Sequence, residues 1–149
     1  NYGFRLSMYN AVGPGSVYAY NSNGDIVDET TYSDGEIIKT YVEPEPRVSL
    51  SYMLDESSSI KVSYQRMAQN VHLLSTSTSD SPTDVWVPSS AIIKPENSSQ
   101  VSAGYFRNFK NNTFETYVEF YYKTMNRQID FKDGANIFLN PHIEADLAF

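Results

Sequence analysis

The sequence predicts an all-β fold of antiparallel strands, and three observations support this prediction. Aromatic residues make up 14% of the chain, with 12 Tyr and 8 Phe, and such residues favour the half-buried surface of a sheet. Apolar and polar residues alternate with a period of two in several segments, as they do on the two faces of a strand. Short polar turns separate neighbouring segments of this kind, which is typical of β-hairpins.

The strongest alternation lies in residues 113–125. One face of the predicted strand is apolar and includes Phe114, Val118 and Phe120. The other face carries Glu115, Glu119 and Lys123. These charges recur every four residues, so a helix is conceivable, but the run of aromatic and β-branched residues favours the strand. Residues 101–109 alternate in the same way, and the polar turn at about 110–112 predicts a hairpin.

An earlier pair of segments repeats this design. Residues 47–54 and 60–67 alternate on either side of a polar turn at about 55–58. The apolar row of this hairpin contains Val48, Leu50, Tyr52, Ile60, Val62 and Tyr64. We also predict a strand at 3–9 and the start of a sixth near His142.

Long connections distinguish one end of these strands from the other. Segments of about 10–45 and 68–98 contrast with the short turns at 55–58 and 110–112, and outer-membrane barrels combine long extracellular loops with short periplasmic turns. The predicted strands also approach the roughly 9–11 residues of a transmembrane strand, whereas globular strands average about 5–6.

Two alternatives follow for the apolar faces. They could pack in a soluble β-sandwich that recognises carbohydrate or protein through Tyr-rich loops, or they could face lipid in a transmembrane β-barrel. Common membrane barrels need at least about eight strands. The membrane alternative, which we favour, therefore predicts that residues 1–149 are a partial barrel domain, an incomplete block of five to six strands from a larger barrel.

Composition argues against several other classes. The net charge of −7 disfavours a nucleic-acid partner, because phosphate backbones require clustered Lys and Arg. The absence of Cys excludes disulfides and Cys-built zinc sites. No segment approaches the roughly 18 apolar residues of a transmembrane helix, and the opening residues Asn1–Arg5 lack the pattern of a signal peptide.

No catalytic or metal-binding pattern emerges. His72 and His142 are far apart in the sequence, and we expect both to be solvent-exposed loop residues rather than a two-His metal site. The chain has neither an EF-hand calcium loop nor a Gly-x-Ser-x-Gly nucleophile motif. We therefore expect no enzymatic activity, no metal and no cofactor.

The candidate ligand-binding residues are aromatic and lie in the long loops: Trp86, Tyr18, Tyr20 and Tyr32. Tyr provides contact area at low entropic cost, so these residues suit a recognition surface, although Tyr packing within the loop explains them equally well. Trp86 could stack on a flat ligand or anchor its loop by packing.

Several segments, taken in order, resemble the C-terminal barrel region of TonB-dependent outer-membrane receptors, in the branch with a carboxypeptidase-regulatory-like N-terminal domain. They are Pro46-Arg47-Val48-Ser49-Leu50-Ser51-Tyr52, Ile60-Lys61-Val62-Ser63-Tyr64-Gln65-Arg66, Pro82-Thr83-Asp84-Val85-Trp86-Val87-Pro88, Ile93-Lys94-Pro95, Ala103-Gly104-Tyr105-Phe106 and Tyr121-Tyr122-Lys123. The resemblance covers roughly residues 44–149.

This resemblance implies a strand block of a bacterial outer-membrane transporter whose barrel has about 22 strands. Its implied partners are outer-membrane lipid, the rest of its barrel, a plug domain, the TonB complex and, in some such receptors, a surface lipoprotein. The imported nutrient would be an iron chelate, cobalamin, glycan or peptide. Glu115, Glu119 and Lys123 would then face the lumen, and neither plug nor TonB box lies in these residues.

Overall fold

The computed structural model describes residues 1–21, 25–74, 84–110, 113–132 and 143–148. The chain divides into two compact units. The first, called here the sheet unit, consists of residues 1–7, 43–68 and 97–126. The second, called here the hairpin unit, consists of residues 8–42, 69–96 and 127–149.

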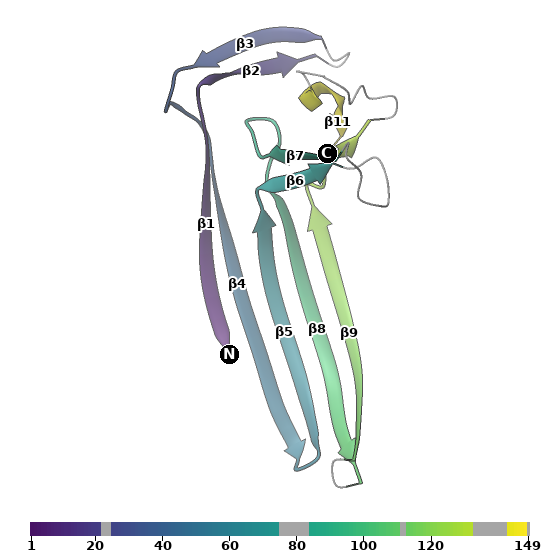
Figure 1. Ribbon diagram of the computed structural model, residues 1–149. Helices are drawn as coiled ribbons and strands as arrows, with labels where there is room; N and C mark the ends of the chain where they lie inside the picture. Colours follow the sequence, from purple (N-terminus) through teal and green to yellow (C-terminus); the bar gives the residue numbers. More distant parts are fainter. Residues whose placement is uncertain (22–24, 75–83, 111–112, 133–142, 149) are drawn as a thin grey trace. The chain divides into compact units, whose positions relative to one another are not determined.

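A five-stranded sheet forms the sheet unit, with the strand order β1-β4-β5-β8-β9. Its strands are β1 (Tyr2–Val12), β4 (Ile37–Asp55), β5 (Ser58–Gln69), β8 (Glu96–Phe109) and β9 (Phe114–Asn126), of which the first four also contribute residues to the hairpin unit. Neighbouring strands run in opposite directions (Figure 1). The sheet is open, because its order ends in β1 on one side and in β9 on the other. These five strands confirm the segments predicted at 3–9, 47–54, 60–67, 101–109 and 113–125.

A short turn closes each of the two hairpins of this sheet. The β4–β5 turn closes with Asp55 opposite Ser58. The Asp55 carboxylate accepts hydrogen bonds from the Ser57 hydroxyl, the Ser58 hydroxyl and the Ser57 N–H. These hydrogen bonds lower the pKa of Asp55 to about 2, and the bond from the Ser58 hydroxyl contributes most to this shift. In the β8–β9 turn the Thr113 N–H donates to the Lys110 carbonyl, and residues 111 and 112 lie outside the described part.

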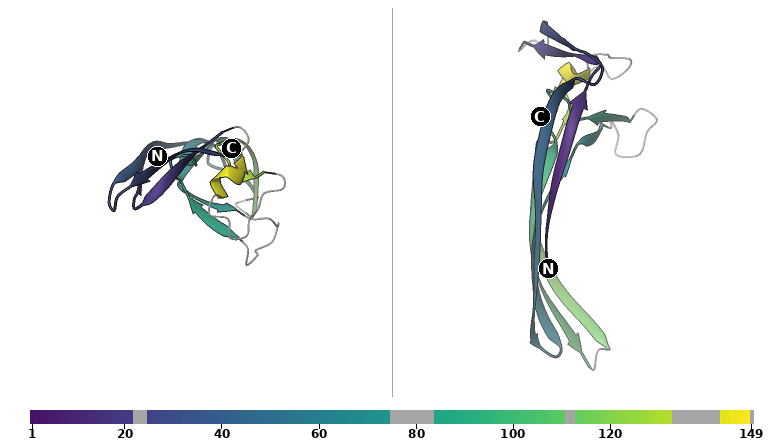
Figure 2. Two further views of the ribbon diagram at one scale, coloured as in Figure 1. Left: turned by 90° about the horizontal axis from the view of Figure 1, so that it is seen from above. Right: turned by 90° about the vertical axis from the view of Figure 1, so that its left-hand side faces the viewer.

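The sheet is a single layer within its unit (Figure 2). Among the described residues, every fully buried hydrophobic side chain belongs to the hairpin unit: Leu74, Val87, Ile93 and Leu147. The described part of the sheet unit contains no second sheet that could pack on its apolar residues, as a β-sandwich would have.

Three short two-stranded sheets build the hairpin unit. They pair β2 (Gly15–Tyr20) with β3 (Ile26–Tyr32), β6 (Val71–Leu74) with β7 (Val85–Pro88), and β10 (Asp130–Phe131) with β11 (Leu147–Ala148). A 3₁₀ turn, η1 (Ile143–Asp146), precedes β11. The small apolar core lies here, with Ile129 and Phe131 packed against its buried residues.

The hairpin unit differs from the prediction in two respects. The segments predicted as long loops at 10–45 and 68–98 contain β2, β3, β6, β7 and the first part of β4. The sixth strand predicted near His142 is instead the 3₁₀ turn followed by the two-residue strand β11, and His142 itself lies outside the described residues. Strands of four to seven residues give too few alternations to stand out in a polar sequence.

Candidate functional site

The register of the sheet separates two chemically different faces. Val48, Leu50 and Tyr52 of β4 lie opposite Tyr64, Val62 and Ile60 of β5. Val101, Ala103 and Tyr105 of β8 lie opposite Tyr122, Phe120 and Val118 of β9, and Phe114 lies opposite Phe109. Because cross-strand partners share a face, each hairpin presents a row of apolar side chains. In the β8–β9 hairpin the pair Arg107–Thr116 lies within this row, between Val118 and Phe114. We call these two rows together the apolar face.

The apolar face is uncovered in the described structure. Phe120 is 74% exposed and Leu50 is 66% exposed, and Phe114 and Val118 are also exposed. Soluble monomers rarely expose a continuous apolar patch of more than a few hundred Å². A surface of this kind is typical of a site of contact with another protein or with a membrane.

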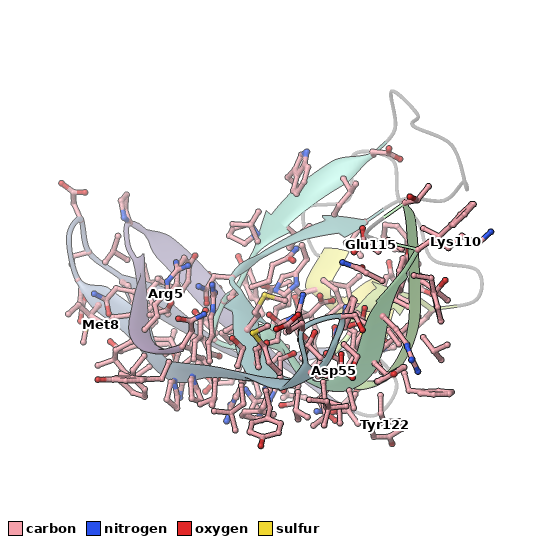
Figure 3. The ribbon with its side chains drawn as sticks, turned by 90° about the horizontal axis from the view of Figure 1, so that it is seen from below. Arg5, Met8, Asp55, Lys110, Glu115 and Tyr122 are labelled. Carbon is pink, nitrogen blue, oxygen red and sulfur yellow. The ribbon has the colours of Figure 1, made fainter. Side chains whose placement is uncertain are left out.

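The opposite face of the sheet, called here the polar face, carries charged and polar side chains. Glu115, Glu119 and Lys123 of β9 lie opposite Asn108, Gly104 and Gln100 of β8, so all three predicted inner residues share it. Figure 3 shows the sheet end-on as an arc, with Arg5 and Glu115 on its inner side and Tyr122 on its outer side. Parts of the polar face on β5 and β8 are less exposed, since Ser63, Ser102 and Phe106 are half-buried and Gly104 is buried. On β9, in contrast, Glu115, Glu119 and Lys123 are exposed.

A buried carboxylate, that of Glu45, lies at one end of the polar face. Glu45 is only 2% exposed, accepts a hydrogen bond from the Ser7 hydroxyl, and lies 3.8 Å from Arg5 Nε and 3.5 Å from Arg47 Nη2. Glu43, also in the sheet unit, accepts a bond of 2.8 Å from Arg66. Sequence reasoning missed both glutamates, because Arg5, Ser7 and Arg66 come from other strands and only the strand pairing brings them to β4.

An aromatic group lies near the opposite end of the polar face. The Phe106 ring stacks on Tyr117 with a centroid distance of 5.7 Å, and Lys61 Nζ lies 4.1 Å from the Phe106 centroid. Gly104 makes room for this group, since a Cβ there would lie 2.9 Å from Phe106 Cε2. The polar face therefore combines charge pairs with a cation–π contact.

Two of the predicted ligand-binding residues line one cavity of about 430 Å³ in the hairpin unit. Tyr18 and Tyr20 of β2 line it together with Asp28 of β3, Glu144 of η1 and Lys132. Its apolar lining includes Ile92 and the buried Leu147. The pKa of Tyr20 is raised, and the largest cause is burial. The negative charge of Glu144 and the neighbouring Tyr18 contribute less to the same shift. We call this space the Tyr20 cavity.

The other two predicted binding residues lie elsewhere. Tyr32 ends β3 and pairs with Gly15, outside the lining of the Tyr20 cavity. Trp86 of β7 pairs with Leu73 and is 64% exposed, whereas its neighbour Val87 is buried in the core. The packing role in this segment therefore belongs to Val87, and the indole of Trp86 is open to solvent.

The expectation that His72 is a solvent-exposed loop residue is wrong. His72 lies in β6 and is 1% exposed, because its side chain shares the buried face of the β6–β7 hairpin with Val87. Its Nε2 lies 3.1 Å from the Ser89 hydroxyl and its Nδ1 lies 3.7 Å from Glu96 Oε1. Burial lowers the pKa of His72, and the Glu96 carboxylate opposes that shift.

The contacts from Ser89 to His72 and from His72 to Glu96 resemble those of a serine-hydrolase triad, in which a carboxylate orients a histidine toward a serine. Ser89 is only 2% exposed, however, and its N–H donates to the Asn70 carbonyl. A substrate carbonyl has no route to a hydroxyl that is buried in this way. The group instead links β6, the end of β7 and the start of β8.

Neither a metal centre nor a membrane-spanning helix is found in the part of the chain that the structure describes. No three His, Asp or Glu side chains there are grouped as metal ligands would be. No helix in the described ranges is both long and apolar enough to cross a bilayer. Comparison with protein-family models, with curated proteins and with solved structures finds no match to this chain.

Proposed function

We propose that this chain is a barrel segment of a TonB-dependent outer-membrane transporter in a bacterium. Strands β1, β4, β5, β8 and β9 cross the membrane, with the apolar face against lipid and the polar face toward the lumen. The remaining strands and the plug come from sequence outside residues 1–149. The protein imports a large nutrient, namely an iron chelate, cobalamin, a glycan or a peptide.

One observation carries this proposal: the two hairpins of the five-stranded sheet present an exposed apolar face that no second layer of the described sheet unit covers. In water that surface would drive association, because burying apolar area is worth about 25 cal/mol per Å². In a bilayer the acyl chains cover it without any protein partner. The lengths of β5, β8 and β9, at 12, 14 and 13 residues, also suffice to cross at a tilt.

The polar face supports the same orientation. On β5 and β8 it includes the half-buried residues Ser63 and Ser102, and on β4 it holds Glu45 with Arg5 and Arg47. Charges of this kind are costly in hydrocarbon and tolerable toward an aqueous or plugged lumen. The family resemblance of residues 44–149 adds the plug domain and the TonB complex as partners of the lumen side.

The sheet has two open edges, β1 and β9, and both indicate that the barrel has further strands. In hydrocarbon, the unpaired N–H and C=O groups of β1 and β9 would cost several kcal/mol each, so both edges need neighbours. In the proposed barrel, β1 and β9 pair with strands from the rest of the protein. The connections that contain β2–β3 and β6–β7 then form part of the extracellular mouth.

An antibody against the β2–β3 hairpin tests this proposal in the cells that produce the protein. The proposal predicts a heat-modifiable band in the outer-membrane fraction, with a mass well above the 16.9 kDa of these residues. A soluble, monomeric protein in the aqueous fraction would overturn it. The same antibody on intact cells tests whether the hairpin reaches the surface.

A further inference from the structure

We propose that the Tyr20 cavity binds an organic ammonium ion, with the cationic head near Glu144 and Tyr20. The cavity lies wholly within the hairpin unit, so this inference does not depend on whether the sheet faces lipid. A volume of about 430 Å³ falls in the range of small-molecule sites.

The distribution of charge in the cavity selects the class of ligand. Three charged residues line it, and the two carboxylates of Asp28 and Glu144 outnumber the single ammonium of Lys132. Glu144 is the half-buried one of the three, whereas Asp28 and Lys132 are exposed. The most enclosed charge is therefore negative, and a carboxylate in a partly desolvated position favours a cation as its neighbour.

The aromatic lining favours a cation that also has an apolar body. Tyr18 and Tyr20 are half-buried, and an ammonium group gains about 0.5–2 kcal/mol over an aromatic face, depending on its desolvation. Burial and, after it, the charge of Glu144 raise the pKa of Tyr20, so the same carboxylate acts at the phenol. Ile92 and the buried Leu147 offer a surface for an alkyl chain.

Two sources share this chemistry: a free alkylamine and the side chain of a lysine in a peptide. Titration of the intact protein with n-pentylammonium chloride and with N-acetyl-lysine amide distinguishes them, followed by NMR of ¹³C-labelled Tyr rings. Saturable shifts of Tyr20 with either compound support the proposal, and the compound that binds more tightly identifies the source. 1-Pentanol provides the uncharged control and maltose the sugar control.

Substitutions then locate the binding site. Glu144→Gln should weaken pentylammonium binding by about tenfold, the usual size for losing one charge-assisted contact. Asp34→Asn removes an exposed carboxylate of the same unit that does not line the cavity, and it should leave the affinity unchanged. Tyr20→Phe should retain binding and Tyr20→Leu should lose it, because only the ring is needed for cation–π contact.

Three results would overturn the inference. They are the absence of saturable binding by both ammonium compounds, equal binding of 1-pentanol, or unchanged affinity in a folded Glu144→Gln variant. If Glu144→Gln does not fold, the comparison of Tyr20→Phe with Tyr20→Leu decides the question. Tighter binding of maltose than of either ammonium compound would also contradict it, since the cavity would then be a sugar site.

Discussion

The hydroxyl oxygens of Ser63 in β5 and Ser102 in β8 lie 2.8 Å apart, which joins the two hairpins of the sheet on its polar face. Ser63 belongs to the polar row of the β4–β5 hairpin, and Ser102 to that of the β8–β9 hairpin. This contact therefore aligns the two polar rows on one side of the sheet and the two apolar rows on the other. The predictions below depend on this alignment.

The first prediction compares two neighbouring residues on opposite faces. Val118→Arg should destabilise the folded protein in a bilayer by about 2–4 kcal/mol if Val118 lies near the bilayer midplane, because Arg would then face lipid. Glu119→Arg places the same side chain on the polar face and should cost less than about 1 kcal/mol. Urea-dependent folding into lipid vesicles measures both values, and equal costs would contradict the assignment of faces.

The second prediction concerns the buried carboxylate of Glu45. Glu45→Ala removes the partner of Ser7, Arg5 and Arg47, and we expect it to destabilise the protein by about 1–3 kcal/mol, a range that allows for the exposure of both arginines. Glu115→Gln is the matched control, because Glu115 is an exposed carboxylate on the same face. A loss no larger in Glu45→Ala than in the control would show that the charge group does not stabilise the sheet.

The third prediction concerns the close approach at Gly104. Gly104→Ala should force the Phe106 ring away from Tyr117 and Lys61, at a cost of about 1–2 kcal/mol. Gly3→Ala provides the control, since a Cβ there meets no atom within 4 Å. In a double-mutant cycle, Phe106→Leu should remove most of the cost of Gly104→Ala. Additive costs would mean that Phe106 is not what restricts residue 104.

The fourth prediction is a pH dependence in the hairpin unit. Because burial lowers the pKa of His72, the unfolded chain takes up a proton there that the folded chain resists. The stability contributed by neutral His72 is therefore complete above its ordinary pKa of about 6.5 and is lost as the pH falls below it. Amide exchange of Val71–Leu74, corrected for intrinsic rates, should show less protection at pH 5.5 than at pH 8.

Two histidine variants provide the controls for that measurement. His72→Gln should flatten the pH dependence, whereas His142→Gln should leave it as in the natural protein. The same slope in His72→Gln as in the natural protein would assign the effect to other titrating groups, such as the carboxylates.

The strands of the sheet could be predicted from the sequence because the pattern that defines each strand lies within that strand and the turn next to it. Alternating chemistry extends over most of β9 and over residues 101–105 of β8, and the short turn at Lys110 fixes their register. The partition of Val118 and Glu119 to opposite faces follows from that periodicity alone.

The hairpin unit could not be predicted in the same way. Its core residues Leu74, Val87, Ile93 and Leu147 come from separate short segments, and no window of sequence contains enough of them to show a period. His72 was misassigned for the same reason, since its burial depends on Ser89 and Glu96 in other segments. Tyr18 and Tyr20 could be named as binding candidates, but their cavity partner Glu144 lies more than a hundred residues away.

The proposal that the apolar face contacts acyl chains is tested most directly by fluorescence quenching from brominated lipids. Trp86 and every other natural tryptophan of the intact protein are first replaced by Phe. Single tryptophans are then introduced as Phe120→Trp and Tyr121→Trp in the reconstituted protein. Lipid-facing indoles are quenched by bromine on the acyl chains, whereas lumen-facing indoles are not. We expect strong quenching at position 120 and little at position 121; equal quenching at both, or none at position 120, would contradict the proposed orientation.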